Sequence, residues 1–309
     1  MHPGVFIPCV DAVTEPPERI PSNRGEPAGF LSSKLFVAEE ITPLFHTPLY
    51  ARLPAPVRLR YNHLHAFYFN EQVAFFEQEM LSPALGAALR LPGLPVEMRT
   101  GLRTFYAEEQ EHTATFRALN RLAAPEFYGE RRPYHFVRVP GAGRGLLRWI
   151  SRRDFALPAM ILLALLQEER SLYYSKRCLQ CVSALEPRFL TVHRQHLADE
   201  AGHIGWDERL LDHLWPRLHR TGRTLTAKVL AWMLDEFFLL PKRSGRNVVR
   251  QLAREFPTLE GPALERALAG LAHNPAFLRT LYSPRIVPRS LRRLSQYPEF
   301  ALLARKLAG

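Results

Sequence analysis

The chain has 309 residues, of which 47% are apolar, and it is long enough to bury a large hydrophobic core. Its three cysteines do not indicate a disulfide framework. The formal charge of +11 predicts a solvated basic surface or an anionic partner, but no zinc-finger, RNA-recognition or basic-zipper pattern occurs, so we do not expect nucleic-acid binding.

Residues 1–56 are rich in proline, which repeatedly removes a backbone hydrogen-bond donor. We expect an extended arm that wraps the rest of the protein, with at most a short helix near residues 35–50. The N-terminus lacks the basic start and continuous apolar stretch of a signal peptide. The longest apolar run, residues 155–166, contains Pro158 and is too short to span a bilayer. We therefore expect a cytoplasmic protein that does not bind membranes.

The first long helix is predicted over residues 57–82. Its apolar stripe includes Leu64, Phe67 and Ala74, and Glu71 occupies the position that continues the stripe between Phe67 and Ala74. A buried carboxylate is costly unless it is paired or bound to a metal ion. Glu71 is therefore a candidate metal ligand.

The second long helix is predicted over residues 96–123. Glu109 and His112 lie three residues apart in it, so their side chains share one face. The neighbouring acids Glu108 and Glu111 lack this spacing and are expected beside the site or on the surface. We predict that Glu109 and His112 are ligands.

The third long helix is predicted over residues 156–182. Its stripe of leucines has Glu169 at the centre, and Glu168 lies one position round the helix as the competing choice. The stripe favours Glu169 as a ligand. Cys178 and Cys181, near the end of this helix, have no second pair to complete a zinc site and are interpreted as packing residues.

The fourth long helix is predicted to begin at Glu186-Pro187 and to end before Pro216. His196, Glu200 and His203 lie at positions i, i+4 and i+7 of this helix and project from one face. They form a second Glu-x-x-His motif with an additional histidine one turn earlier.

The order Glu, Glu-x-x-His, Glu, Glu-x-x-His along four helices is typical of ferritin-like dimetal carboxylate bundles. We therefore predict an all-α fold with a ferritin-like four-helix core and peripheral helices. A competing interpretation is a non-catalytic helical binding protein in which the same residues form buried ion pairs. The predicted ligands are seven residues: Glu71, Glu109, His112, Glu169, His196, Glu200 and His203.

Four carboxylates and three imidazoles suit iron better than zinc, because structural zinc sites favour cysteine and histidine. Four carboxylates also nearly balance the charge of two ferrous ions, so such a pair can be buried. We prefer iron to manganese on the same ground. The expected cofactor is therefore a pair of iron ions.

We expect residues 1–309 to form one domain, because the predicted ligands occur without an intervening linker. The dimetal core would occupy residues 57–216, and residues 217–309 would form further helices that pack on it. The arginines near residues 285–293 indicate a solvated helix face or a docking surface for an acidic protein.

The ligand pattern, including His-x-x-x-Glu-x-x-His at His196, Glu200 and His203, resembles the p-aminobenzoate N-oxygenase family of diiron oxygenases. The resemblance implies that a diiron centre activates O2 and oxygenates an arylamine toward a nitro group, as in secondary metabolism. It also implies a homodimer. An external reductase or ferredoxin is expected as electron donor, because the chain has no Gly-x-Gly-x-x-Gly fingerprint for a nicotinamide or flavin.

Two other functions fit the same ligands. One is a diiron hydroxylase that acts on carbon or on a substrate tethered to a carrier protein, which the basic surface would accommodate. The other is a ferritin-like ferroxidase, although the proline-rich arm and the C-terminal helices favour a substrate cavity instead. O2 consumption that depends on an added small-molecule substrate distinguishes an oxygenase from a ferroxidase.

Overall fold

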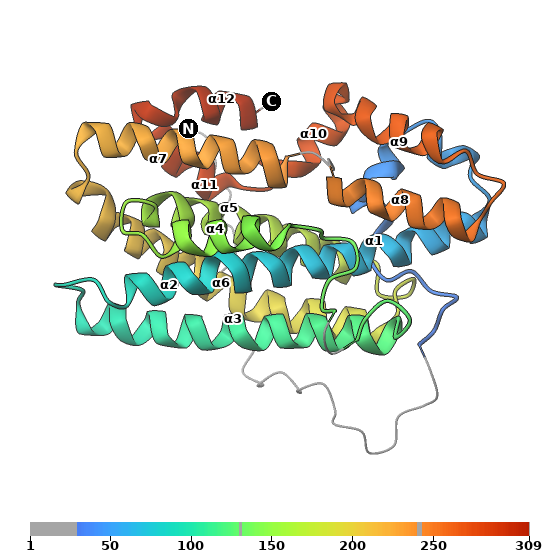
Figure 1. Cartoon of the computed structure of the whole chain (residues 1–309), viewed down its shortest axis with the longest axis horizontal. Coiled ribbons are helices and arrows are strands. Elements are labelled where there is room, and N and C mark those ends of the chain that lie inside the picture. Colours follow the sequence, from blue (N-terminus) through green and yellow to red (C-terminus); the bar gives the residue numbers. More distant parts are fainter. Residues whose placement is uncertain (1–29, 130–131, 240–242, 309) are drawn as a thin grey trace, which may run out of the picture.

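The computed structural model describes residues 30–129, 132–239 and 243–308. Within these ranges the regular structure is helical (Figure 1), and strand pairing is limited to isolated bridges such as that between Leu35 and Leu185. The predicted all-α, ferritin-like fold is confirmed.

The described part of the proline-rich arm packs against the first core helix. It contains three short 3-10 helices, η1 (Glu39–Ile41), η2 (Pro43–His46) and η3 (Tyr50–Arg52). The Asn62 side chain accepts a hydrogen bond from the Phe36 N–H and donates one to the Val37 carbonyl, both at 2.8 Å. These bonds hold the described part of the arm on the bundle. The remainder of the arm, residues 1–29, lies outside the described residues and includes Cys9.

The core of the bundle consists of long helices that lie side by side: α1 (Ala55–Phe76), α3 (Val96–Ala123), α5 (Leu157–Leu179) and α6 (Pro187–Leu214). The bounds of α3, α5 and α6 agree with the predicted helices to within a few residues, whereas the first predicted helix, 57–82, is divided. Helix α1 ends at Phe76, but the chain stays helical beyond it, through the π-helical turn η4 (Glu77–Leu81) and then α2 (Ser82–Ala88).

Helix α6 begins where its sequence predicts. Pro187 occupies the first turn, where its missing N–H leaves no hydrogen bond unmade. The Glu186 carboxylate accepts hydrogen bonds from the N–H groups of Arg188 and Phe189, at 2.8 and 3.1 Å. A carboxylate in this position accepts hydrogen bonds from first-turn N–H groups that have no partner within the helix. Its charge also interacts favourably with the positive end of the helix dipole.

At Gly101 the side chain of Trp206 on α6 packs directly against the backbone of α3. A Cβ atom at this position would lie 2.0 Å from Cζ2 of Trp206. Only glycine therefore allows the Trp206 ring to occupy its present place between the helices that carry the Glu-x-x-His motifs.

The C-terminal helices cover the side of the bundle opposite α3 (Figure 1). Helices α7 (Arg220–Met233), α10 (Pro275–Tyr282) and α11 (Pro288–Ser295) pack on α5, and α8 (Arg243–Glu255) packs on α1. Helix α4 (Gly141–Ser151) follows α3 and precedes α5 in the sequence, and it packs against η4 and α2. The bounds of the other C-terminal elements are η5 (Trp215–Arg217), η6 (Leu234–Phe238, a π-helical turn), α9 (Gly261–Gly270), η7 (Leu271–His273), η8 (Pro298–Phe300) and α12 (Ala301–Ala308).

A single cluster of buried hydrophobic side chains includes residues from Phe36 to Leu307, so the C-terminal helices share a core with the bundle. The expected single-domain organisation stays a prediction. None of the described helices combines the length and the apolar character needed to cross a bilayer.

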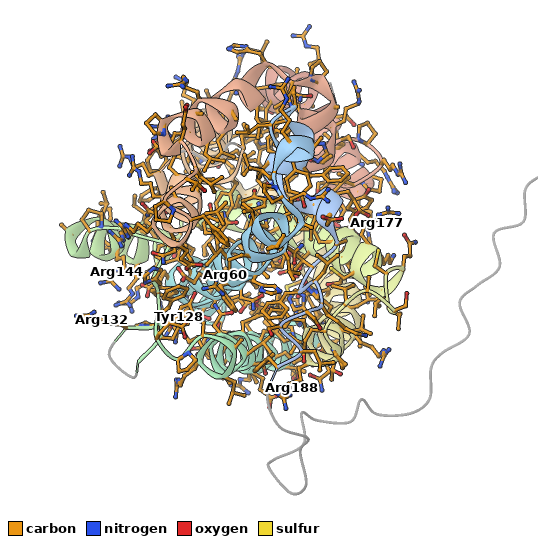
Figure 2. All side chains as sticks on the ribbon, turned by 90° about the vertical axis from the view of Figure 1, so that its right-hand side faces the viewer. Arg60, Tyr128, Arg132, Arg144, Arg177 and Arg188 are labelled. Atoms are coloured by element: carbon orange, nitrogen blue, oxygen red, sulfur yellow. The ribbon has the colours of Figure 1, made fainter. Side chains whose placement is uncertain are left out.

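The positive charge is spread over several elements. Figure 2 shows Arg132 and Arg144 near each other on one side of the molecule, and Arg177 and Arg188 elsewhere on its periphery. Near the C-terminus, Arg293 is paired with Asp212 at 2.7 Å. The predicted basic surface is therefore distributed and partly neutralised.

Candidate metal centre

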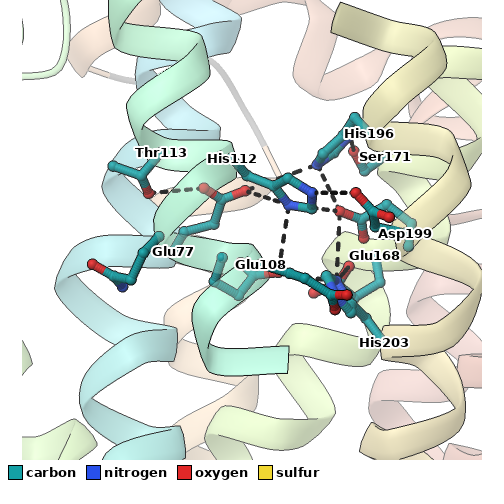
Figure 3. Close-up of polar contacts among 12 residues, drawn as sticks. Glu77, Glu108, His112, Thr113, Glu168, Ser171, His196, Asp199 and His203 are labelled. Carbon is teal, nitrogen blue, oxygen red and sulfur yellow. Dashed lines mark hydrogen bonds and ion pairs between the residues drawn. The ribbon is translucent and has the colours of Figure 1, made fainter. Parts of the chain in front are cut away.

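Helices α3 and α6 direct their Glu-x-x-His motifs toward each other. Figure 3 shows the imidazoles of His112, His196 and His203 gathered between the helices. His203 Nδ1 lies 3.0 Å from Glu109 Oε1, and His112 Nδ1 lies 3.7 Å from Glu200 Oε1. All five side chains are buried. The structure thus brings together the five predicted site residues of these two helices.

Glu77, from the π-helical turn η4, joins this cluster. Its Oε1 atom lies 3.8 Å from His196 Nε2 and 4.0 Å from His112 Nδ1. The Thr113 hydroxyl donates a hydrogen bond to the other carboxylate oxygen at 2.9 Å and so holds the side chain in place. Burial, followed by the negative charge of Glu109, raises the pKa of Glu77 well above its ordinary value.

Glu168 of α5 completes the cluster. Its Oε2 atom lies 3.7 Å from His203 Nδ1, and its side chain is buried. Burial and the nearby charge of Glu109 raise the pKa of Glu168 to about 7. A second carboxylate so close to Glu109 is costly without cations between them, which favours a site for positive charge.

The ligand atoms form two overlapping groups that share His112. Within each group the atoms lie within 4.8 Å of one another, which is compact enough for one metal ion to contact all of them. Two neighbouring groups of this kind are compatible with two adjacent ions, with the single lone pair of the inward His112 nitrogen serving one of them. The groups are Glu109, His112, Glu200 and His203, and Glu77, His112 and His196.

The hydrogen bonding of the atoms that point into this cluster indicates whether a metal ion fits there. Buried polar atoms normally have hydrogen-bond partners, and each exception needs an explanation. Several such exceptions converge here, and all of them are atoms that bind metal ions through a lone pair. The residues therefore fit a metal pair. The atoms are both carboxylate oxygens of Glu109, Oε2 of Glu200, Nδ1 of His112, Nε2 of His196 and Nδ1 of His203.

The outward nitrogen of each imidazole has a polar contact. Such contacts fix the orientation of a ligating histidine and the nitrogen that carries its proton. The inward nitrogens are thereby left for a metal ion. The contacts are His112 Nε2 with Asp199 Oδ2 at 3.1 Å, His196 Nδ1 with Ser171 Oγ at 3.1 Å, and His203 Nε2 with Glu108 Oε2 at 2.9 Å.

The carboxylates of the cluster shift the pKa values of two of its histidines. Burial opposes the charge on His112, but the Asp199 and Glu109 carboxylates outweigh it and raise the pKa of His112 to about 10. Glu109 and Glu168 likewise outweigh burial and raise the pKa of His203 to about 11. The carboxylates of the cluster thus favour positive charge at both histidines. Metal ions would displace the protons that carry this charge, because ligating imidazoles are neutral.

The structure does not bring Glu71 into the cluster. Its carboxylate accepts hydrogen bonds from the Tyr128 hydroxyl at 2.6 Å and from the N–H groups of His135, Phe136 and Val137 at 2.7 to 2.9 Å. Successive backbone N–H groups form an anion-binding nest, which explains how this buried charge is satisfied. Among the acids of the first helical segment, Glu77 and not Glu71 lies beside His112 and His196.

Glu169 is also directed elsewhere. Its carboxylate accepts hydrogen bonds from the backbone N–H groups of Arg289 and Ser290 at 2.9 and 2.7 Å, at the N-terminus of α11. That helix end offers unpaired donors and a favourable dipole. The competing residue Glu168 is the one that faces the cluster, so the stated preference for Glu169 is corrected.

The sequence contained a weak signal for Glu77. It lies three residues after Ala74, so it continues the same apolar stripe that led to Glu71. Helix α1 is buried on nearly all sides from Tyr61 to Glu71, and the stripe therefore could not discriminate between candidate positions. The change to a π-helical turn at Glu77 then alters the direction of the side chain.

Asp207 was not anticipated either. It lies one turn after His203 on α6, it is fully buried, and neither carboxylate oxygen has a hydrogen-bond partner. Burial, together with the charge of Glu168, raises the pKa of Asp207 well above its ordinary value. Its spacing of four residues from His203 was the available signal.

A small cavity of about 50 Å³ opens beside the cluster. Glu77, Glu168, His196 and Glu200 line it, so the candidate metal ligands form part of its wall. Arg170 also lines the cavity and donates hydrogen bonds to the hydroxyls of Tyr174 and Tyr282. The site therefore has an adjoining space that a reacting group can enter.

Comparison with known proteins places this geometry in a family. The sequence matches the family described as P-aminobenzoate N-oxygenase AurF over residues 26–258, which is well over half of the chain. The matched range contains every residue of the cluster. No curated protein matches the sequence.

Proposed function

This chain belongs to the p-aminobenzoate N-oxygenase AurF family of diiron oxygenases, and we propose that it uses O2 to oxygenate the nitrogen atom of an arylamine. The observation that carries the proposal is the convergence of unpartnered, buried imidazole and carboxylate atoms beside a cavity. Such a convergence has a cost in stability unless cations occupy it.

The proposed ligands differ from those predicted from the sequence at two positions. Two iron ions held by these side chains would supply the electrons and the Lewis acidity that O2 activation needs. The donor set contains no cysteine, which favours iron over structural zinc. The ligands are Glu77, Glu109, His112, Glu168, His196, Glu200 and His203.

The surrounding residues orient the ligands and exclude water. The Phe105 ring stacks on His203 with ring centroids 4.1 Å apart, and the Phe116 ring lies edge-on to His196 at 5.1 Å. Both phenylalanines are fully buried. Apolar walls of this kind strengthen electrostatic interactions within the site and limit side reactions with water. The cavity beside His196 is where the amine would meet the centre.

The first oxygenation of an amine gives a hydroxylamine and water, and it needs electrons that the amine does not provide. We therefore propose an external reductase or ferredoxin as donor, as the sequence indicates. A homodimer and a cytoplasmic location remain predictions. Oxygenation at carbon, or of a substrate held by a carrier protein, is the alternative outcome of the assay below.

The proposal is tested with purified protein reconstituted with ferrous iron under anaerobic conditions. We expect about two iron ions per chain, as in other dimetal carboxylate bundles. O2 uptake in the presence of a chemical reductant should rise when 4-aminobenzoate or another arylamine is added, and mass spectrometry should show the hydroxylamine or nitro product.

Two results would contradict the proposal. Iron that binds but consumes O2 at a rate independent of any amine would indicate a ferroxidase. A chain that retains no iron after reconstitution would leave a helical binding protein with buried ion pairs.

A further inference from the structure

The cavity beside the metal ligands is too small for an arylamine ring. Its volume is about 50 Å³, whereas an engineered protein cavity that binds one benzene molecule has a volume of about 150 Å³. The amino group of a substrate fits in this space, but the aromatic body needs room elsewhere.

A second cavity of about 400 Å³ provides that room. It lies between α1, the segment that leads into α4, and the π-helical turn η6. Ligand pockets of proteins typically have volumes of about 300 to 1,000 Å³ and mostly apolar walls. The wall of this cavity includes Phe75, Met80, Leu147 and Phe237, so it is largely apolar.

The two cavities share part of their walls. Gln72 of α1 and Phe238 of η6 line both of them. The Phe238 ring packs edge-on against Phe76 at 5.8 Å, and its carbonyl oxygen lies 3.5 Å from Nη1 of Arg170. Gln72 and Phe238 thus mark the junction between the large cavity and the metal ligands.

Two π-helical turns contribute to the walls of both cavities, η4 through Glu77 and Met80 and η6 through Phe238. π-helical turns are rare and occur frequently at functional sites, because the additional residue redirects side chains. The presence of both turns in the walls of the two adjoining cavities supports a functional role for this region.

We propose that the substrate of this enzyme is an arylamine with an apolar body longer than one ring. The body occupies the large cavity, and only the amino group passes Gln72 and Phe238 to reach the metal ligands. This inference rests on the proposed function for the nature of the reacting group. The size of the body follows from the cavity, which has more than twice the volume of a benzene-sized cavity.

The opening of the large cavity also suits an extended molecule. Trp232 and Leu146 line it and are about half exposed, at 48% and 55%. Arg138 and Arg243 lie at the same wall. The far end of the substrate can therefore reach solvent between apolar and cationic side chains, while the amine end lies inside.

The test measures binding without turnover, by calorimetry under anaerobic conditions without reductant. The probes are aniline, with one ring, and 4-aminobiphenyl, with two. We expect 4-aminobiphenyl to bind at least about tenfold more tightly, because a second buried ring adds well over the 1.4 kcal/mol that a tenfold difference represents. Equal affinities for the two probes would overturn the inference.

A substitution that fills the large cavity sharpens the test. Val139 lines this cavity and lies in an irregular segment that can accept a larger side chain, so Val139→Trp should weaken 4-aminobiphenyl binding at least about tenfold and change aniline binding less than about twofold. Val182→Trp is the control, because Val182 is exposed and lines neither cavity. If Val139→Trp does not fold, Leu146→Trp at the cavity mouth serves the same purpose.

The outcomes separate this inference from the proposed function. A chain that binds iron but prefers aniline keeps the diiron assignment and overturns the extended substrate. A chain without iron that still prefers 4-aminobiphenyl, and loses that preference in Val139→Trp, supports the cavity assignment and contradicts the diiron function. Loss of binding of both probes in Val139→Trp with a retained fold would also overturn the inference.

Discussion

The Nδ1 atom of His203 on α6 lies 3.0 Å from Oε1 of Glu109 on α3, and both side chains are only 1% exposed. This pair joins the two Glu-x-x-His motifs across the bundle. The contact is an ion pair when His203 is protonated, and neither atom has a further hydrogen-bond partner. In the proposed function a metal ion replaces the imidazole proton and is bound by both atoms.

Glu168→Gln and Glu169→Gln should have opposite effects. Glu168 faces His203, so its substitution is expected to lower the iron bound per chain while the fold is kept. Glu169 accepts two backbone N–H bonds at the start of α11, so its substitution should leave iron binding intact and lower the free energy of unfolding by about 1 to 3 kcal/mol. Metal analysis and urea unfolding of the two variants check this. Iron loss in Glu169→Gln alone would restore the sequence-based assignment.

Glu77→Gln and Glu71→Gln form a second pair. Loss of the Glu77 carboxylate removes a candidate ligand near His112 and His196, so we expect reduced iron content and little change in thermal stability. Glu71 is satisfied by backbone donors of residues 135–137 and by Tyr128, so Glu71→Gln should lower stability by about 1 to 3 kcal/mol. The measurements are iron content and thermal unfolding. A Glu77→Gln variant that keeps its full iron content would remove Glu77 from the centre.

The contrast between these residues shows what could be predicted from the sequence. Glu109 and His112 lie on one helix, where a spacing of three residues guarantees a common face. The same holds for His196, Glu200 and His203. The periodicity alone therefore sufficed for these five residues, and also for the bounds of the helices that carry them.

Helical periodicity could not predict the binding partners of Glu71 and Glu169. Both are buried acids, as their place in an apolar stripe predicts, but their partners are backbone N–H groups more than sixty residues away in the sequence. A stripe indicates that a side chain is buried, and it does not indicate what satisfies its charge. The π-helical turn at Glu77 could not be predicted from the sequence either, because it depends on packing and has no sequence signature.

The buried His63 should make the fold sensitive to acid. Its ring stacks on Phe36 with centroids 3.9 Å apart and contacts the Lys34 carbonyl at 2.8 Å. Burial lowers the pKa of His63 from 6.5 to about 4. Between these pH values the unfolded chain binds a proton that the folded chain does not, so stability is full above pH 6.5 and falls as the pH falls toward 4.

His63→Gln removes this contribution. Glutamine can still donate to the Lys34 carbonyl but does not gain a charge in acid. We expect the wild type to lose roughly 3 kcal/mol more than the variant between pH 7 and pH 4, as an upper bound from the pKa difference. Urea unfolding at a series of pH values measures the difference. Parallel stability curves for the two proteins would show that His63 does not contribute to acid unfolding.

Gly101→Ala should disturb the distance between the two motif helices. The new Cβ would lie 2.0 Å from the Trp206 ring, which Arg209 covers at 4.7 Å, so the ring has to move. Overpacking of this kind costs about 1 to 3 kcal/mol, which exceeds the gain of about 1 kcal/mol in helix propensity. We expect lower stability and weaker iron binding. Gly202→Ala is the control, because no atom lies within 4 Å of its Cβ position. The control should raise stability by up to about 1 kcal/mol. A stabilised Gly101→Ala variant with unchanged iron content would mean that the α3–α6 distance does not depend on this glycine.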